Sequence, residues 1–108
     1  MRLARVATPQ GARPVVGTAD GWEEGVDLFA THLVRTGVHH PADAALLAPV
    51  QPLVVLGMAH NTGPDDRALP PQAFLKSARS VVGPGEPIVI DPRRGRVVGE
   101  GELAVVIG

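Results

Sequence analysis

The chain contains no cysteine, which excludes disulfide bonds, thiolate catalysis and cysteine-ligated zinc. Aromatic residues are also scarce, with two Phe, one Trp and no Tyr, which argues against base-stacking platforms and aromatic sugar-binding surfaces. A formal net charge of −1 favours neither nucleic acid nor an anionic membrane. No apolar run approaches the length of a membrane span, and the N-terminus lacks the apolar segment of a signal peptide. We therefore expect a cytoplasmic protein without nucleic-acid or membrane partners.

The composition that remains is that of a globular protein, with 44% hydrophobic and 19% charged residues in 108 positions. Residues 2–8 and 13–19 alternate in polarity around a turn at 9–11, which predicts a hairpin. An apolar stripe after Asp20 predicts a helix over 22–35 that ends at Gly37. These elements describe a small N-terminal α+β domain over residues 1–50.

The sequence pattern changes near residues 49–52, from the elements above to apolar runs separated by polar loops. We place the start of a second domain, 51–108, at this point. An apolar strand is predicted over 53–57, a polar loop over 58–71, and further strands over 72–76 and 87–90. The run 103–107 is apolar on both faces, which predicts a buried interior strand. The fold class is therefore mostly β with minor α.

A pair of carboxylates, Glu100 and Glu102, opens this last strand. Residues two apart on a strand project to the same face, so the two like charges would need a cation between them. Mg²⁺ prefers such oxygen ligands and is often held by one or two carboxylates. The alternative is an ordinary surface pairing with Arg93, Arg94 or Arg96, and spacing alone favours that alternative.

Several sequence blocks resemble the fumarylacetoacetate hydrolase superfamily in their order along the chain, and the segment that begins at Met1 resembles the small leading domain of bacterial members. The Phe-Leu-Lys block stands 24 residues before Glu100, a spacing similar to that of the family. The blocks are Leu47-Ala48-Pro49-Val50, Phe74-Leu75-Lys76-Ser77, Val82-Gly83-Pro84-Gly85 and Glu100-Gly101-Glu102-Leu103-Ala104-Val105-Val106-Ile107-Gly108.

The resemblance implies a mixed β-sandwich or roll fold, of which residues 51–108 are the first part of an apparently truncated catalytic domain. It also implies that Glu100 and Glu102 ligate Mg²⁺, Mn²⁺ or Ca²⁺, with a third, acidic ligand expected beyond Gly108. Members hydrolyse or decarboxylate β-dicarbonyl or 2-oxo acids by C–C bond cleavage. The substrate would thus be a small oxo acid, and we expect a homo-oligomer, most simply a dimer.

Three further residues are candidates for the site. His60 falls within one residue of the family's general base, and Asp65 or Asp66 could orient it, although no Tyr is present and no Glu follows three residues later. Lys76 resembles a family lysine that would contact a substrate carboxylate or oxyanion, and Arg67 is a candidate for binding a substrate carboxylate. Each has a structural alternative: His60 could pack in a loop, Lys76 could lie at the surface with only its stem buried, and Arg67 could be an exposed loop arginine.

Two other functions stay open at this point. The chain could be a non-catalytic assembly module or fragment, since it stops inside a predicted strand. On its own we expect it to expose strand edges, to associate or misfold, and to be inactive. On the same fold, the chemistry could instead be isomerisation or hydration of a 2-oxo acid.

Overall fold

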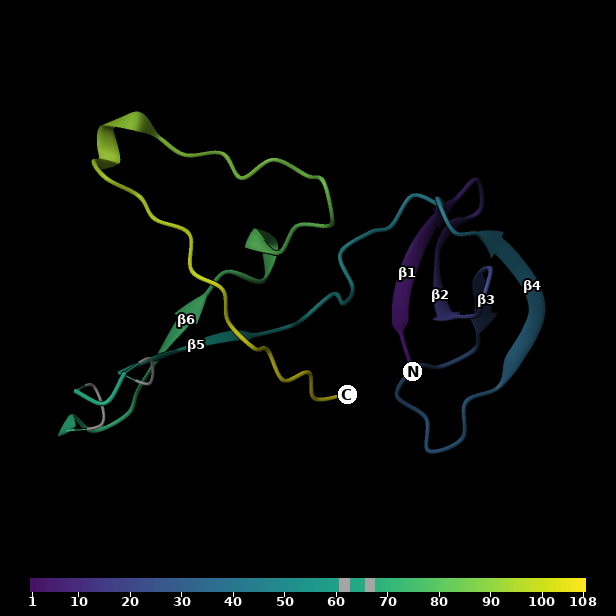
Figure 1. Cartoon of the computed structure of the whole chain (residues 1–108), viewed down its shortest axis with the longest axis horizontal. Helices are drawn as coiled ribbons and strands as arrows, with labels where there is room; N and C mark the ends of the chain where they lie inside the picture. Colours follow the sequence, from purple (N-terminus) through teal and green to yellow (C-terminus); the bar gives the residue numbers. More distant parts are fainter. Residues whose placement is uncertain (61–62, 66–67) are drawn as a thin grey trace.

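The computed structural model describes residues 1–60, 63–65 and 68–108, which form two separate antiparallel sheets (Figure 1). A four-stranded sheet has the order β1-β2-β3-β4, and a two-stranded sheet pairs β5 with β6. The chain is therefore mostly β, as predicted. The predicted division into residues 1–50 and 51–108 stays a prediction.

The predicted N-terminal hairpin is confirmed by strands β1 (Leu3–Thr8) and β2 (Gly11–Gly17). Gly11 adopts a φ of 108°, a conformation that glycine tolerates far better than other residues. The Thr8 hydroxyl donates to the carbonyl of Gly11 at 2.7 Å and accepts the N–H of Gln10 at 3.2 Å. Local turn chemistry thus sets the register of this hairpin.

The helix predicted over 22–35 is wrong, because this stretch contributes to β3 (Gly21–Gly25), a connection, and the start of β4 (Arg35–Pro41). A glycine within a helix costs about 1 kcal/mol relative to alanine, and Gly25 lies inside the predicted one. β3 instead gains backbone pairing with β2 and β4 and buries Trp22. Tertiary pairing therefore overrides the helical apolar spacing.

The core lies on the four-stranded sheet and contains Ala4, Val6, Val15, Val16 and Trp22. Burying each valine fully contributes roughly 1.5–3 kcal/mol. The outer edge of β1 is covered by residues 45–47, whose backbone exchanges hydrogen bonds of 2.9 Å with residues 5 and 7. Residues 45–47 therefore run beside β1 as an extended connection.

The second sheet is formed by β5 (Val55–Ala59) and β6 (Gln72–Lys76). β6 matches its predicted range, and β5 begins two residues later than predicted. Gly57 lies opposite Phe74, and a Cβ on Gly57 would overlap the Phe74 ring. The absent side chain therefore makes room for an aromatic ring.

Residues 77–108 contain two short 3₁₀ helices, η2 (Ala78–Ser80) and η3 (Pro92–Arg94), and no strand. The strands predicted over 87–90 and 103–107 are thus wrong, and the latter run is exposed rather than interior. Leu103 and Ile107 are 96% and 92% exposed. An apolar run becomes a strand only where another strand completes its hydrogen bonds, and none of the described segments lies beside it in that way.

The molecule is open rather than tightly packed. Its radius of gyration is 17.3 Å, against about 13 Å expected for a compact domain of this length. The C-terminal segment returns across the β5–β6 sheet toward the N-terminal sheet (Figure 1). Among the described residues, no helix is long and apolar enough to cross a membrane.

Candidate functional site

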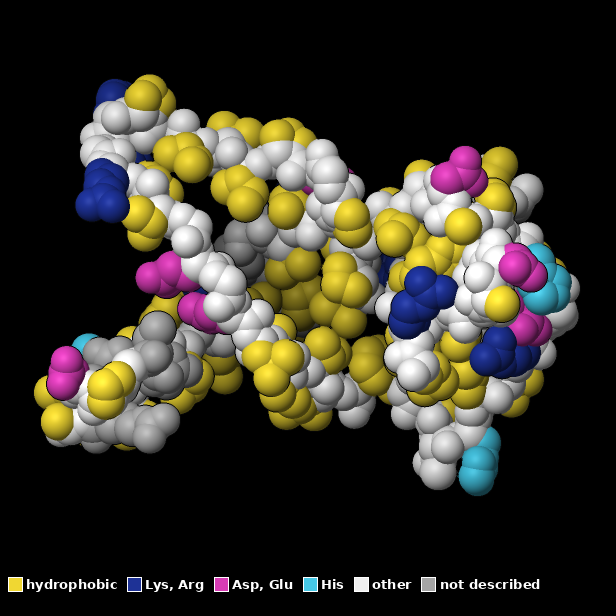
Figure 2. Space-filling model, viewed as in Figure 1, with side chains coloured by type: hydrophobic (Ala, Val, Ile, Leu, Met, Phe, Trp, Pro, Cys, Tyr) yellow, Lys and Arg dark blue, Asp and Glu magenta, His cyan; other side chains and the backbone are white. Residues whose placement is uncertain are grey.

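A large cavity lies between the two sheets and the C-terminal segment, with a volume of about 1560 Å³. Hydrophobic side chains surround this hollow (Figure 2). Its walls come from five parts of the chain that lie apart in sequence. The lining residues are Leu3, Arg5, Pro14, 26–29, 49–58, Lys76, Val81 and 101–107.

Lys76 contributes a positive charge to this cavity from the end of β6, opposite Val55 of β5. Its ammonium nitrogen lies 5.5 Å from the centroid of the Phe74 ring, within the range of a cation–π contact. Phe74 in turn occupies the space that Gly57 leaves open. The lysine is exposed, so its charge is accessible to an anionic ligand.

Glu102 lines the same cavity, whereas Glu100 does not. Both side chains are exposed, and neither forms an ion pair with a residue in the described part of the chain. Arg93 instead forms a closed pair with Asp91, with Nη2 2.8 Å from Oδ2. The hydrogen bond from Arg93 lowers the pKa of the Asp91 carboxyl and raises the pKa of the guanidinium. The surface pairing considered as an alternative for these glutamates is therefore not formed.

His60 directly follows β5 and does not line the cavity. Val55, opposite Lys76, and Ala59 lie four residue steps apart, so about 13 Å of strand separates the two ends. The hairpin thus places His60 and Lys76 at opposite ends. His60 also has a φ of 61°, which is uncommon for a residue other than glycine and marks local strain.

Two of the predicted loop residues, Arg67 and Asp66, lie outside the described residues. Asp65 is described and exposed, and its backbone carbonyl accepts the N–H of Ala68 at 3.3 Å. No ion pair of Asp65 with His60 is formed. The acidic helper of the candidate base stays a prediction.

The described residues supply some, but not all, of the ligands that a divalent cation needs. Within 1–60, 63–65 and 68–108, no three His, Asp or Glu side chains gather closely enough to hold a metal ion. Glu100 and Glu102 nevertheless provide two hard oxygen donors without a competing cation, the donor type that Mg²⁺ prefers. A cation held there would draw its other ligands from water, substrate or other acidic groups.

Residues 26–29, which form one wall of the cavity, were predicted to lie in a helix. Asp27 instead accepts the N–H of Phe29 at 2.9 Å, a local turn that holds the connection after β3. Phe29 lies in close contact with Gly108 at the other end of the chain. The turn-forming Asp27, two residues after Gly25, was the signal available for a connection here.

Comparison with known proteins places this geometry in context. Residues 44–108 match the family model described as fumarylacetoacetate (FAA) hydrolase C-terminal. The protein Rv2993c of Mycobacterium tuberculosis (strain H37Rv) is 31% identical over 124 aligned positions, which include 100% of this chain and 46% of that protein. The chain thus spans about half the length of this relative.

Three solved structures are also similar. The 5-carboxymethyl-2-hydroxymuconate delta-isomerase from Mycobacterium smegmatis has 32% identity and a TM-score of 0.65, covering 82% of this chain and 37% of that one. Cg1458 has 35% identity and a TM-score of 0.66, with coverages of 83% and 37%. The 2-hydroxyhepta-2,4-diene-1,7-dioate isomerase from Mycobacterium marinum has 31% identity and a TM-score of 0.60, with coverages of 76% and 34%.

Proposed function

Because this chain belongs to the fumarylacetoacetate hydrolase family, we propose that it forms part of an enzyme that isomerises enolisable 2-oxo or 2-hydroxydienoic acids. The observation that carries the proposal is the large cavity that Lys76 and Glu102 share. A cation and a carboxylate in one apolar cavity suit an acidic substrate with a metal-binding end. Two of the similar solved structures carry names of isomerases that act on such acids.

The proposed roles follow from charge and position. Glu100 and Glu102 would hold a divalent cation, which when bound supplies Lewis acidity that stabilises an enolate oxygen. Lys76 would bind a carboxylate of the substrate, and its contact with Phe74 restrains the ammonium group. The apolar walls would contact the carbon chain of the substrate.

Isomerisation also needs a group that removes a proton from one carbon and returns it to another. His60 is the candidate from the sequence. His60 follows β5, at the end of the hairpin opposite Lys76. The role of His60 is therefore tested separately from those of Lys76, Glu100 and Glu102. An H60Q variant that keeps full activity would remove His60 from the mechanism without affecting the assignment of Lys76.

A second candidate function is metal-dependent hydrolysis or decarboxylation of β-dicarbonyl acids, in which a C–C bond breaks. The family match supports this candidate. The same residues would stabilise the enolate that cleavage releases. Product analysis separates the two functions, since an isomer keeps the mass of the substrate and cleavage yields two fragments or CO₂.

The test removes the two carboxylates. We expect E100Q and E102Q each to lower Mn²⁺ affinity by at least about tenfold, since even groups outside the metal's first shell are worth about that factor. Calorimetry with Mn²⁺ and absorbance of a 2-hydroxydienoic acid would follow binding and turnover. D43N is the matched control, because Asp43 is exposed and lines neither cavity. Unchanged Mn²⁺ binding in the E100Q/E102Q double variant would refute the metal assignment.

A further inference from the structure

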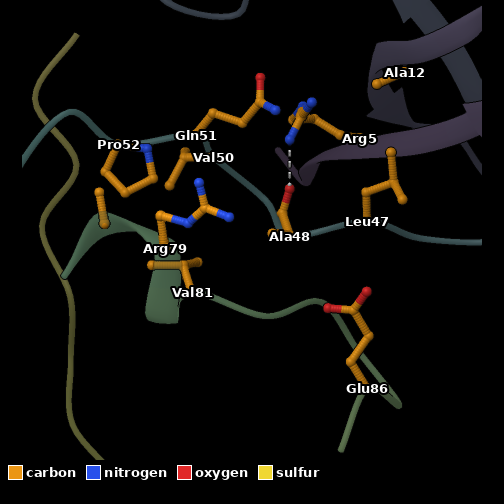
Figure 3. Close-up of a pocket in the computed structure, with 11 residues that line it drawn as sticks. Arg5, Ala12, Leu47, Ala48, Val50, Gln51, Pro52, Arg79, Val81 and Glu86 are labelled. Carbon is orange, nitrogen blue, oxygen red and sulfur yellow. Dashed lines mark hydrogen bonds between the residues drawn. The ribbon is translucent and has the colours of Figure 1, made fainter.

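A second, smaller cavity of about 500 Å³ lies between the N-terminal sheet and η2, and neither Lys76 nor Glu102 lines it. Two guanidinium groups reach it from separate elements, Arg5 from β1 and Arg79 from η2. The carboxamide of Gln51 extends beside Arg5, and Arg79 extends toward the same space (Figure 3). Three side chains with N–H donors therefore line one small cavity.

Arg5 is held in place by the backbone around it. Its Nη1 donates to the carbonyl of Ala48 at 3.2 Å, and its own carbonyl accepts the N–H of Leu47 at 2.9 Å. The guanidinium is half-buried, and this single hydrogen bond uses only part of its fork of donors. The remaining donors are positioned for a ligand without further ordering of the side chain.

Arg79 has no carboxylate partner among the residues that the structure describes. One carboxylate, that of Glu86, also lines the cavity, but it accepts the backbone N–H of Gly83. Glu86 lies away from the two guanidinium groups (Figure 3). Two like charges thus face one space, where an oxyanion would relieve their repulsion and accept bidentate hydrogen bonds.

We propose that Arg5, Gln51 and Arg79 form a binding site for the carboxylate group of a small organic acid. The rest of the wall selects this class over a bare phosphate ion, because Leu47, Val50, Pro52 and Val81 offer apolar contact to a carbon chain. The volume suits a small molecule. Arg5 and Gln51 also line the large cavity, so the two cavities adjoin, but Arg79 lines the smaller one and none of the three residues has a role in the proposed isomerase.

The experiment titrates the protein with hexanoate, acetate and inorganic phosphate while the Nε–Hε signals of its arginines are followed by NMR. We expect saturable shifts of the Arg5 and Arg79 signals, with hexanoate binding more tightly than acetate or phosphate. R79Q should weaken hexanoate binding by about tenfold, because a charge-assisted hydrogen bond is lost. The hexanoate affinity of R79K should lie between those of the wild type and R79Q, since lysine keeps the positive charge but lacks the paired N–H donors of a guanidinium group.

R94Q is the control of equal charge change, because Arg94 is exposed in η3 and does not line this cavity. Q51L tests the third side chain and leaves the charge unaltered. The proposal is overturned if the arginine signals do not saturate, or if R94Q weakens hexanoate binding as much as R79Q does. Tighter binding of phosphate than of hexanoate would overturn the organic-acid assignment.

Discussion

Carboxylates of β3 meet an arginine and a histidine of β4 across the outer pair of strands in the N-terminal sheet. Glu23 Oε2 lies 2.7 Å from Arg35 Nη1, and Glu24 Oε1 lies 2.9 Å from His40 Nε2. The Glu23 side chain is 14% exposed and also accepts the N–H of Gly37 at 3.3 Å. These contacts attach an edge strand whose residues are largely exposed. Side-chain charge therefore supports β4 where little apolar burial is available.

The Glu23 contact predicts a pH dependence. The hydrogen bond from Arg35 lowers the pKa of Glu23 below its ordinary value of 4.5. A lowered pKa in the folded state means that the contact stabilises the fold above that value, and that its contribution is lost as pH falls below it. We expect the thermal midpoint of E23Q to decrease less than that of the wild type as the pH falls from about 5 to about 3. An unchanged slope in E23Q, or an equal flattening in the control D43N, would contradict this origin.

The backbone of His60 supports a prediction on stability. A residue with φ of 61° lies in the left-handed region, which Asn tolerates and a β-branched residue does not. We expect H60N to keep the free energy of unfolding within about 0.5 kcal/mol, and H60V to lower it by about 1–2 kcal/mol. Urea denaturation measures both, and equal stability of the two variants would show that the strain is absent.

At the scale of elements, the pairing of β5 with β6 determines where the candidate residues lie. Isolated two-stranded sheets are marginally stable in water, so the contact of Phe74 with Gly57 matters for this pair. The hairpin holds Lys76 beside the large cavity and carries His60 away from it. Its integrity is therefore a condition for the proposed function.

This contact can be tested with G57A, whose new methyl group would overlap the Phe74 ring. Overpacking of this kind costs about 1–3 kcal/mol. In an F74A background the same substitution should cost at least about 1 kcal/mol less, because the two residues are in contact. Hydrogen exchange of the β5 and β6 amides would report the loss. G99A is the control, since no atom lies within 4 Å of a Cβ at that position, and equal effects would contradict the packing argument.

At the scale of the whole molecule, apolar surface remains exposed on the C-terminal half. Leu103, Val105 and Ile107 are 96%, 84% and 92% exposed, and Ile88 and Val89 are 78% and 92% exposed. Exposed apolar side chains that lie close together along one segment, as those of 103–107 do, are typical of interaction surfaces. We propose that association of copies, expected from the family resemblance, uses the segment 103–107.

The prediction is that the triple variant L103S/V105S/I107S associates less than the wild type at equal concentration. Each exposed apolar side chain contributes to association through the surface that contact removes from water. Sedimentation velocity over a concentration series measures the effect. The control I88S/V89S/I90S removes similar apolar surface from another part of the chain. If the control abolishes association and the triple variant does not, the segment assignment is wrong.

Local chemistry was enough to predict part of this fold. The alternation of residues 2–8 and 13–19, the turn at 9–11 and the strand at 72–76 all depend on neighbours in sequence, and each is confirmed. The mostly β class and the family followed from the same kind of reading, because ordered blocks persist along the chain. The candidate site residues, two glutamates, a histidine and a lysine, came from the family resemblance, since spacing alone favoured a surface pairing for the glutamates; their roles stay predictions.

The tertiary structure decided which of these residues meet. The apolar spacing of 22–35 fits a helix, yet pairing with β2 placed its first residues in a strand, because backbone partners from elsewhere in the chain outweigh a weak helical preference. The run 103–107 has the composition of an interior strand and stays exposed for want of a pairing neighbour in the described chain. Sequence alone thus determined which side-chain chemistry is available. Long-range contacts placed Lys76 and Glu102 on one cavity, placed His60 away from it, and placed Arg5 and Arg79 on the second cavity.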